Sequence, residues 1–222
     1  MTTIISDINT SSDSGNGKIR ETMEKHKTHI GYMGMPARIT CPCALYCLDT
    51  CYAYALEKFR TNNGVKYAKN YELSKLDEFV DMVNAEIAKK HYADKYIRLH
   101  VDGDFYSAEY FAKWVKIALA NPDIIFYAYT KSVKIVKDYE AEFGLPKNMS
   151  ISYSYGGKED YLINPETDKH VIVIDEDAPA PAGYVEGNHD DLAVVYNQKV
   201  YLRYHGKKKW VNSGFSKVIL PI

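Results

Sequence analysis

All four cysteines of this 222-residue chain lie within one short segment, at Cys41, Cys43, Cys47 and Cys51. Disulfide-stapled proteins spread their cysteines to join distant segments, and they need an oxidising compartment. This short run fits neither condition. Free cysteines are often buried as small apolar residues, but random placement rarely gathers all of them in one place. We therefore predict that the four thiols bind a soft metal, as thiolates do.

The spacing of these cysteines is C-x-C-x₃-C-x₃-C. Structural zinc sites usually have two cysteine pairs separated by a longer loop, whereas single-loop motifs hold iron–sulfur clusters. If the chain is helical from Leu45, residues four apart drift by only about 40° around the helix. Cys43, Cys47 and Cys51 would then share one face and could grip one large inorganic cluster. The spacing favours a [4Fe–4S] cluster, with zinc as the less favoured metal.

Strands and helices alternate in the middle of the chain. Apolar periodicity and capping residues predict strands at 96–101, 124–129 and 149–154, and helices at 107–120 and 133–142. A further helix is predicted from an N-cap at Ser74 to residue 91. Strand, helix and strand joined by short connections are typical of right-handed βαβ units and a parallel sheet. The predicted fold class is therefore α/β, as an incomplete parallel (β/α) barrel or an open parallel sheet.

The charge pattern changes in the last third of the chain. Residues 159–191 hold ten acidic residues and one lysine, and residues 192–222 hold six Lys or Arg and no acid. Two short apolar runs, 192–196 and 200–204, predict a small C-terminal β-hairpin. We divide the chain into a flexible tail (1–16), a core with the cysteine motif (17–158) and an extension packed on the same domain (159–222).

Polar residues follow each predicted strand. Parallel α/β sheets bind ligands at the carboxyl ends of their strands, so these residues are expected to converge on one edge. A small anionic ligand is the expected occupant, since a half-buried lysine at a strand end needs an anionic partner. The candidate binding residues are Asp102, Gly103, Asp104, Thr130, Lys131, Ser132, Ser152 and Ser154.

Each of these clusters also has a purely structural interpretation. Asp102, Gly103 and Asp104 can simply build a turn. Ser132 can be the N-cap of the helix that follows it. His100 can be a hydrogen-bonded core histidine, as lone histidines usually are. The catalytic residues, if the protein is an enzyme, remain unassigned.

The formal net charge of −1 removes any argument from overall basicity for nucleic acid or a membrane surface. No apolar run approaches the roughly 18 residues of a membrane span, and the first residues lack the pattern of a secretory signal. We therefore expect a cytoplasmic protein that does not contact membranes. The basic, aromatic stretch 199–217, with Lys207, Lys208, Lys209 and Trp210, could bind nucleic acid or a host protein. Alternatively, it neutralises the acidic stretch before it.

Several motifs in a fixed order resemble the phage "gene product 88" family. They are I-G-Y-M-G-M-P at 30–36, T-C-P at 40–42, C-Y-A at 51–53, H-V-D-G-D-F-Y-S at 100–107 and F-Y-A-Y-T-K-S at 126–132. The resemblance spans roughly residues 28 to 155. Members are mostly phage proteins of undetermined function, so the resemblance implies the cytoplasm of a host cell but little biochemistry.

That family is itself similar to radical S-adenosylmethionine enzymes. This similarity implies a radical-SAM-like partial barrel, three cysteines on a [4Fe–4S] cluster and S-adenosylmethionine on the open iron. Cys41, Cys47 and Cys51 match the family's cysteines and Cys43 is extra. Gly103 and Asp104 lie where such enzymes carry an acidic, glycine-rich motif.

Two functions remain open from the sequence. The first is an iron–sulfur protein with a radical-SAM-like site, in which the cluster would donate an electron to cleave S-adenosylmethionine. The usual C-x₃-C-x₂-C spacing is absent, and a fourth cysteine could close the cluster. The second is therefore a non-catalytic protein in which all four cysteines hold iron–sulfur or zinc while the basic stretch engages a host protein or nucleic acid.

Overall fold

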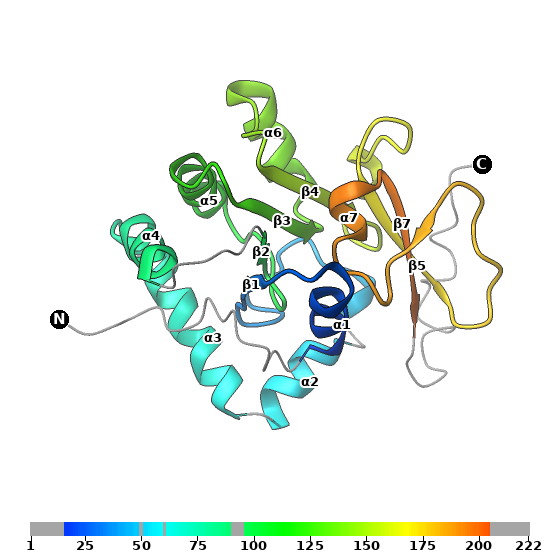
Figure 1. Ribbon diagram of the computed structural model, residues 1–222, viewed down its shortest axis with the longest axis horizontal. Coiled ribbons are helices and arrows are strands. Elements are labelled where there is room, and N and C mark those ends of the chain that lie inside the picture. Colours follow the sequence, from blue (N-terminus) through cyan, green and yellow to red (C-terminus); the bar gives the residue numbers. More distant parts are fainter. Residues whose placement is uncertain (1–15, 49–50, 60, 90–95, 205–222) are drawn as a thin grey trace.

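The computed structural model describes residues 16–48, 51–59, 61–89 and 96–204. Its centre is a parallel sheet in which seven strands of the described chain follow the order β1-β2-β3-β4-β5-β7-β6 (Figure 1). The strands are β1 (Ile30–Met33), β2 (Tyr96–Leu99), β3 (Ile125–Thr130), β4 (Met149–Ser154), β5 (His170–Asp175), β6 (Val185–Glu186) and β7 (Lys199–Tyr204).

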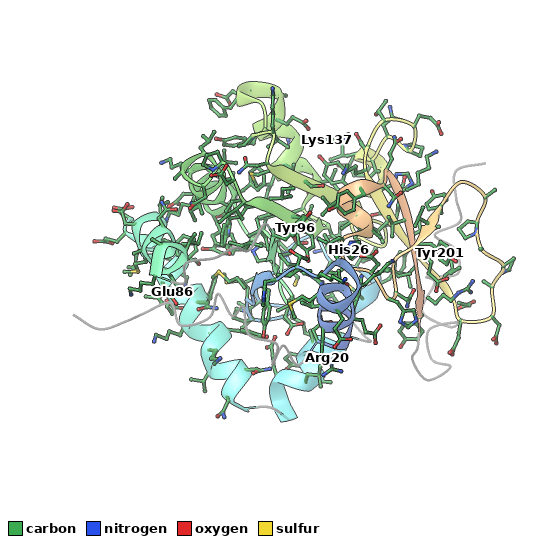
Figure 2. All side chains as sticks on the ribbon, viewed as in Figure 1. Arg20, His26, Glu86, Tyr96, Lys137 and Tyr201 are labelled. Carbon is green, nitrogen blue, oxygen red and sulfur yellow. The ribbon has the colours of Figure 1, made fainter. Side chains whose placement is uncertain are left out.

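Helices cover both faces of this sheet. They are α1 (Gly17–His26), α2 (Tyr52–Phe59), α3 (Thr61–Ser74), α4 (Phe79–Lys89), α5 (Ala108–Ala120), α6 (Val133–Phe143) and α7 (Ala193–Tyr196), with single 3₁₀ turns η1 (Tyr46–Leu48) and η2 (Asp160–Leu162). Helices α4, α5 and α6 line one face, and α1 and α7 lie on the other (Figure 1). Side chains fill the space between the sheet and its helices (Figure 2).

Alternation along the strands divides the core into two clusters. On β3, Phe126 and Ala128 pack toward Trp114 of α5, whereas Tyr127 packs with Ile19 of α1 on the opposite face. Successive side chains of a strand point to opposite faces. Both faces of β3 are therefore buried, as is typical of a parallel sheet.

The predicted α/β fold with a parallel sheet is confirmed. Strand β4 has the predicted bounds, and β2, β3, α5 and α6 lie within a few residues of theirs. The Ser107 hydroxyl accepts a hydrogen bond from the Tyr110 amide and caps α5 as expected. Among the described residues no pairing joins β1 to β6, so the sheet is open between these strands, and a radical-SAM-like barrel is not confirmed.

The predicted C-terminal β-hairpin is wrong. Residues 193–196 form the short helix α7, and β7 lies parallel between β5 and β6. A short apolar run cannot by itself distinguish a strand from one turn of helix. Burial decides the outcome, because Leu192, Ala193 and Val194 are almost fully enclosed against the sheet.

The predicted helix from Ser74 is wrong at its start. Ser74 is instead the last residue of α3, and its hydroxyl donates to the Tyr71 carbonyl. The Lys113 ammonium of α5 donates to the carbonyls of Ser74 and Leu76, which satisfies groups that the end of α3 leaves open. A contact from a distant helix therefore fixes this boundary. Strands β1, β5 and β6 were also not predicted.

Parts of two expectations lie outside the described residues. They are residues 1–15 of the predicted tail and residues 205–222, which hold most of the basic stretch. Within the part of the chain that the structure describes, no helix is long and apolar enough to cross a membrane.

Candidate functional site at the carboxyl edge of the sheet

The segment 34–48, here called the cysteine loop, lies across the carboxyl ends of the central strands. The Met35 amide donates to the Asp102 carbonyl after β2 at 2.9 Å, and the Tyr46 amide donates to the Gly156 carbonyl after β4 at 3.2 Å. The Cys43 carbonyl accepts from the Lys158 amide at 2.8 Å. The loop is thus fixed by backbone bonds over the edge at which ligands of parallel sheets usually bind.

Asp104 joins the ends of β2 and β3 beneath this loop. Its Oδ1 accepts from the Phe105 amide at 2.7 Å and from the Thr130 hydroxyl at 2.5 Å, and its Oδ2 accepts from the Lys131 amide at 2.8 Å. Burial raises the pKa of Asp104 to about 6, although these donors oppose the rise. The hydrogen bonds to this carboxylate therefore come from the protein itself.

The Lys131 ammonium likewise forms its hydrogen bonds within the protein. Its ammonium donates to the Ser154 carbonyl at 3.0 Å, to the Ser154 hydroxyl at 2.8 Å and to the Tyr155 carbonyl at 2.8 Å. An ammonium has three hydrogens to donate, so these bonds use all of them. Burial lowers the pKa of Lys131. Its partner is therefore the end of β4 rather than the expected anionic ligand.

Two predicted serines also bond inside the chain. The Ser132 hydroxyl donates to the Phe105 carbonyl at 2.7 Å and gives no side-chain cap to α6. The Ser152 hydroxyl donates to the Val194 carbonyl at 3.3 Å, on the face that α7 covers. The structure therefore gathers Asp102, Gly103, Asp104, Thr130, Lys131, Ser132 and Ser154 at one edge and directs Ser152 to α7.

Asp102 differs from these residues. It is half-buried, and burial raises its pKa to about 6, with the charge of Glu57 adding to the rise. The Tyr67 hydroxyl forms a hydrogen bond with this carboxylate. Glu57 lies on α2 and Tyr67 on α3, so the site gathers groups from three parts of the chain. No sequence pattern marked Glu57 or Tyr67, because their proximity to Asp102 arises only on folding.

The turn that carries Asp102 is conformationally strained. His100 has φ of 67° and Gly103 has φ of 85°. A left-handed backbone costs free energy in a non-glycine residue, and such strain often lies at functional sites. The His100 ring is buried and bonds the Tyr110 hydroxyl at 3.0 Å, and burial lowers its pKa to about 3. His100 is thus a neutral core histidine.

The cysteines do not share the face of one helix. Among the described residues near Cys47 the helical structure is the single turn η1, and α2 begins after Cys51. The Cys43 thiol forms hydrogen bonds with the side chains of Glu159 and Ser132. Burial raises the pKa of Cys41 to about 12 and that of Cys43 to about 11, so both are protonated thiols at neutral pH.

The predicted function as a metal protein is therefore wrong, both as an iron–sulfur protein with a radical-SAM-like site and as a closed iron–sulfur or zinc protein. In the described ranges, which include all four cysteines, no group of three or more His, Cys, Asp or Glu side chains could hold a metal ion. The arrangement of Cys43, Cys47 and Cys51 on one face assumed a helix from Leu45, but the described residues after Leu45 form a single 3₁₀ turn, Tyr46–Leu48.

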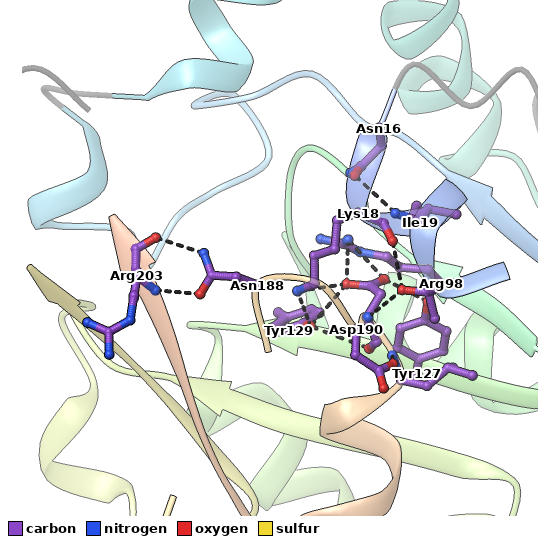
Figure 3. Close-up of polar contacts among 12 residues, drawn as sticks. Asn16, Lys18, Ile19, Arg98, Tyr127, Tyr129, Asn188, Asp190 and Arg203 are labelled. Carbon is purple, nitrogen blue, oxygen red and sulfur yellow. Dashed lines mark hydrogen bonds and ion pairs between the residues drawn. The ribbon is translucent and has the colours of Figure 1, made fainter. Parts of the chain in front are cut away.

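A second polar cluster lies on the face covered by α1 and α7. Asp191 is fully buried and accepts from Arg98 of β2, from Lys18 of α1 and from the hydroxyls of Tyr127 and Tyr129 (Figure 3). Burial raises the pKa of Asp191, but the charges of Arg98 and Lys18 outweigh it and hold the pKa below its usual value. The sequence did not reveal this cluster, because its members are far apart in the chain.

The chain resembles two curated phage proteins. It is 36% identical over 111 residues to the Gene 88 protein of Mycobacterium phage L5, and 34% identical over 111 residues to the Gene 88 protein of Mycobacterium phage D29. Each alignment covers 45% of this chain and 46% of the relative, so the match spans a little less than half the length of those relatives. No solved structure matches. The profile of the family described as "Gene product 88" matches residues 9–216, and the chain belongs to that family.

Proposed function

We propose that this protein binds a small molecule at the carboxyl edge of its sheet, and that Asp102 contacts a positively charged group of that molecule. The proposal concerns the same edge that the sequence indicated. It differs in the sign of the ligand's charge, and the hydrogen bonds of the edge residues support a positive sign.

The contrast between the two aspartates of one turn carries the proposal. Asp104 accepts three hydrogen bonds from its own chain, whereas Asp102 has the Tyr67 hydroxyl as its hydrogen-bond partner and is half-buried beside Glu57, another carboxylate. A carboxylate with a raised pKa at the edge where such sheets bind ligands is a candidate for function. A cationic group would relieve the repulsion between Asp102 and Glu57.

The lysine and arginine side chains near this edge also favour a positively charged ligand, because each already bonds to the protein. Lys131 donates all its hydrogens to the end of β4, and Lys158 donates to the Pro42 carbonyl at 2.8 Å. Arg38 donates to the Leu48 carbonyl and lies over the Tyr54 ring. Lys158 and Arg38 hold the cysteine loop and Lys131 holds the end of β4, so an anion would have to displace existing bonds.

The described part of the basic stretch gives little support for binding nucleic acid. Lys199 forms an ion pair with Glu166 at 3.5 Å, and Arg203 donates to the carbonyls of Glu176 and Ala178. These cations already contact the acidic segment, in line with the neutralisation alternative. The remaining lysines of the stretch lie outside the described residues.

Calorimetric titration of the full chain with a panel of amines, comprising basic amino acids and polyamines, tests the proposal. At least one amine is expected to bind, and Asp102→Asn should weaken its binding about tenfold or more, equivalent to about 1.4 kcal/mol. Asp123→Asn is the matched control, since Asp123 is an exposed aspartate at the opposite edge, before β3. Equal affinity of wild type and Asp102→Asn would overturn the assignment.

A further inference from the structure

Helix α1 buries little apolar surface against the sheet. Of its ten residues, Ile19 and Met23 are the buried apolar ones, whereas six apolar residues of α5 are buried. Burial of apolar surface is the main favourable contribution to folding. Segments with few buried apolar contacts open locally at a lower cost in free energy than the rest of a protein. We therefore expect α1 to leave the sheet before α5 does.

Polar contacts near the surface anchor α1 to the segment that precedes α7. Glu21 Oε2 forms a hydrogen bond with His189 Nδ1 at 2.8 Å. Asp190 Oδ2 accepts from the Lys25 ammonium at 2.8 Å and lies 2.9 Å from His26 Nε2. The side chains of Lys25 and His189 are 61% and 78% exposed. Such pairs contribute little to stability because water competes for both partners, so they can break while the sheet stays folded.

Beneath α1, the Lys18 ammonium is held by Asp191 and Tyr129. It lies 3.0 Å from Asp191 Oδ1, donates to the Tyr129 hydroxyl at 2.9 Å and lies 4.9 Å from the centre of the Tyr129 ring (Figure 3). A carboxylate, an accepting hydroxyl and an aromatic face are groups that recognise an amine cation. The Lys18 side chain is 18% exposed and that of Asp191 is 0% exposed, so the ammonium lies one side chain below the surface.

Asp191 keeps its other partners when Lys18 is removed. Arg98 donates to both carboxylate oxygens at 3.0 Å, and the hydroxyls of Tyr127 and Tyr129 donate to them at 2.7 Å and 3.0 Å. Arg98 alone balances the charge of Asp191, so Lys18 adds a second buried positive charge. Burial lowers the pKa of Lys18, Asp191 opposes this change, and Arg98 adds to it. The cluster can therefore lose Lys18 without leaving an unpaired buried charge.

We propose that Asp191 and Tyr129 form a binding site for a small molecule with a primary ammonium group, and that α1 is a latch that fills this site with its own Lys18. A ligand of this class competes with Lys18 when α1 opens. The ammonium must carry hydrogens, because both the carboxylate and the hydroxyl accept one, and a quaternary amine has none to donate. The site lies on the face covered by α1 and α7, and it is separate from the proposed ligand contact at Asp102.

Hydrogen exchange of the full-length protein, measured by mass spectrometry on peptides from α1 and α5, tests the latch. In the wild type, α1 should exchange about tenfold faster than α5 or more. Asp190→Asn weakens the contacts of Lys25 and His26, and it should speed the exchange of α1 about threefold. Asp138→Asn is the matched control, since it removes an exposed ion pair on α6 and should leave α1 unchanged. Equal exchange rates of α1 and α5 in the wild type would overturn the proposal.

The cation n-propylammonium, compared with sodium at the same ionic strength and pH, tests the site. In the wild type it competes with Lys18, so it should speed the exchange of α1, about twofold at a concentration equal to its dissociation constant. In Lys18→Ala it replaces the atoms that the substitution removes, beneath the closed helix. There it should slow the exchange of α1 and raise Tm by about 2 °C or more.

The opposite signs in the two proteins distinguish a binding site from a lysine that is only structural. Tetramethylammonium should have neither effect, and Tyr129→Phe, which removes the accepting hydroxyl, should weaken the response of the wild type to n-propylammonium. If Lys18→Ala does not fold by circular dichroism, the wild type and Tyr129→Phe still decide the outcome. An α1 exchange rate in the wild type that does not respond to n-propylammonium, or that responds equally to both amines, would overturn the proposal.

Discussion

One guanidinium nitrogen of Arg98 donates to both carboxylate oxygens of Asp191, each at 3.0 Å, although 93 positions separate the two residues. Arg98 lies on β2 and Asp191 precedes α7, so the pair joins the sheet to the segment that covers it. The Lys18 ammonium reaches the same carboxylate at 3.0 Å and adds α1. Three distant parts of the chain meet at one buried negative charge.

Asp191→Asn should lower the free energy of unfolding by about 3 to 5 kcal/mol at pH 7, because it leaves two buried cations without their counter-charge. The wild type should also lose this stability as pH falls below about 4, since a carboxylate with a depressed pKa stabilises only while ionised. Urea unfolding at several pH values measures both effects. Asp138→Asn is the control, because its ion pair with Lys134 is exposed and should contribute little to stability. Equal losses in both variants would contradict the prediction.

Gly103→Ala should destabilise the protein by about 3 kcal/mol or more. Its φ of 85° strains any side chain, and an added Cβ would lie 2.5 Å from the Thr40 hydroxyl oxygen and 2.6 Å from the Met35 Cβ. Gly183→Ala separates backbone strain from the close contact, since Gly183 has φ of 80° but no atom lies within 4 Å of an added Cβ. In urea unfolding, Gly183→Ala should lower the free energy of unfolding by only about 1 kcal/mol. Similar costs at both glycines would mean that the close contact contributes nothing.

Asp102→Asn should become more stable relative to the wild type as pH rises from about 4 to about 6. The raised pKa of Asp102 means that its ionisation in the folded state costs free energy, fully so above about pH 6 and not at all below its usual value near 4. We expect a gain of about 1 to 3 kcal/mol at pH 7. Thermal unfolding across this range measures it, with Asp123→Asn as the control. A difference that does not change with pH would refute the stated cause.

Thr130→Val should cost about 1 to 3 kcal/mol, because it removes the buried hydroxyl that donates to Asp104 at 2.5 Å. That hydrogen bond lowers the pKa of Asp104, so its loss should raise this pKa further above about 6. Urea unfolding and a carboxyl NMR titration measure the two effects. Thr167→Val, at an exposed threonine, should change stability by less than about 0.5 kcal/mol. A Thr130→Val protein with an unchanged Asp104 titration would show that the hydroxyl bond is unimportant.

The central fold could be predicted because its signals are local. The cap at Ser107, the apolar face of α5 and the alternation along β2 each depend on residues close in the chain. Consecutive βαβ units then require a parallel sheet, since each strand pairs with the next. The convergence of Asp104, Thr130 and Lys131 at one edge followed from this topology alone.

Which partners these residues bind was decided only by the tertiary structure. Whether Lys131 meets a ligand or the end of β4 depends on the distance between two loops, and no sequence pattern reports it. The same holds for α7, whose apolar residues became a helix because of the surface that they cover. The spacing of the cysteines fixed how near they are in the chain, but only the fold decided the partners of a thiol, such as Glu159 and Ser132 at Cys43. Hydrogen bonds and buried charges act over a few ångströms in space, so sequence reveals them only where neighbours in space are also neighbours in the chain.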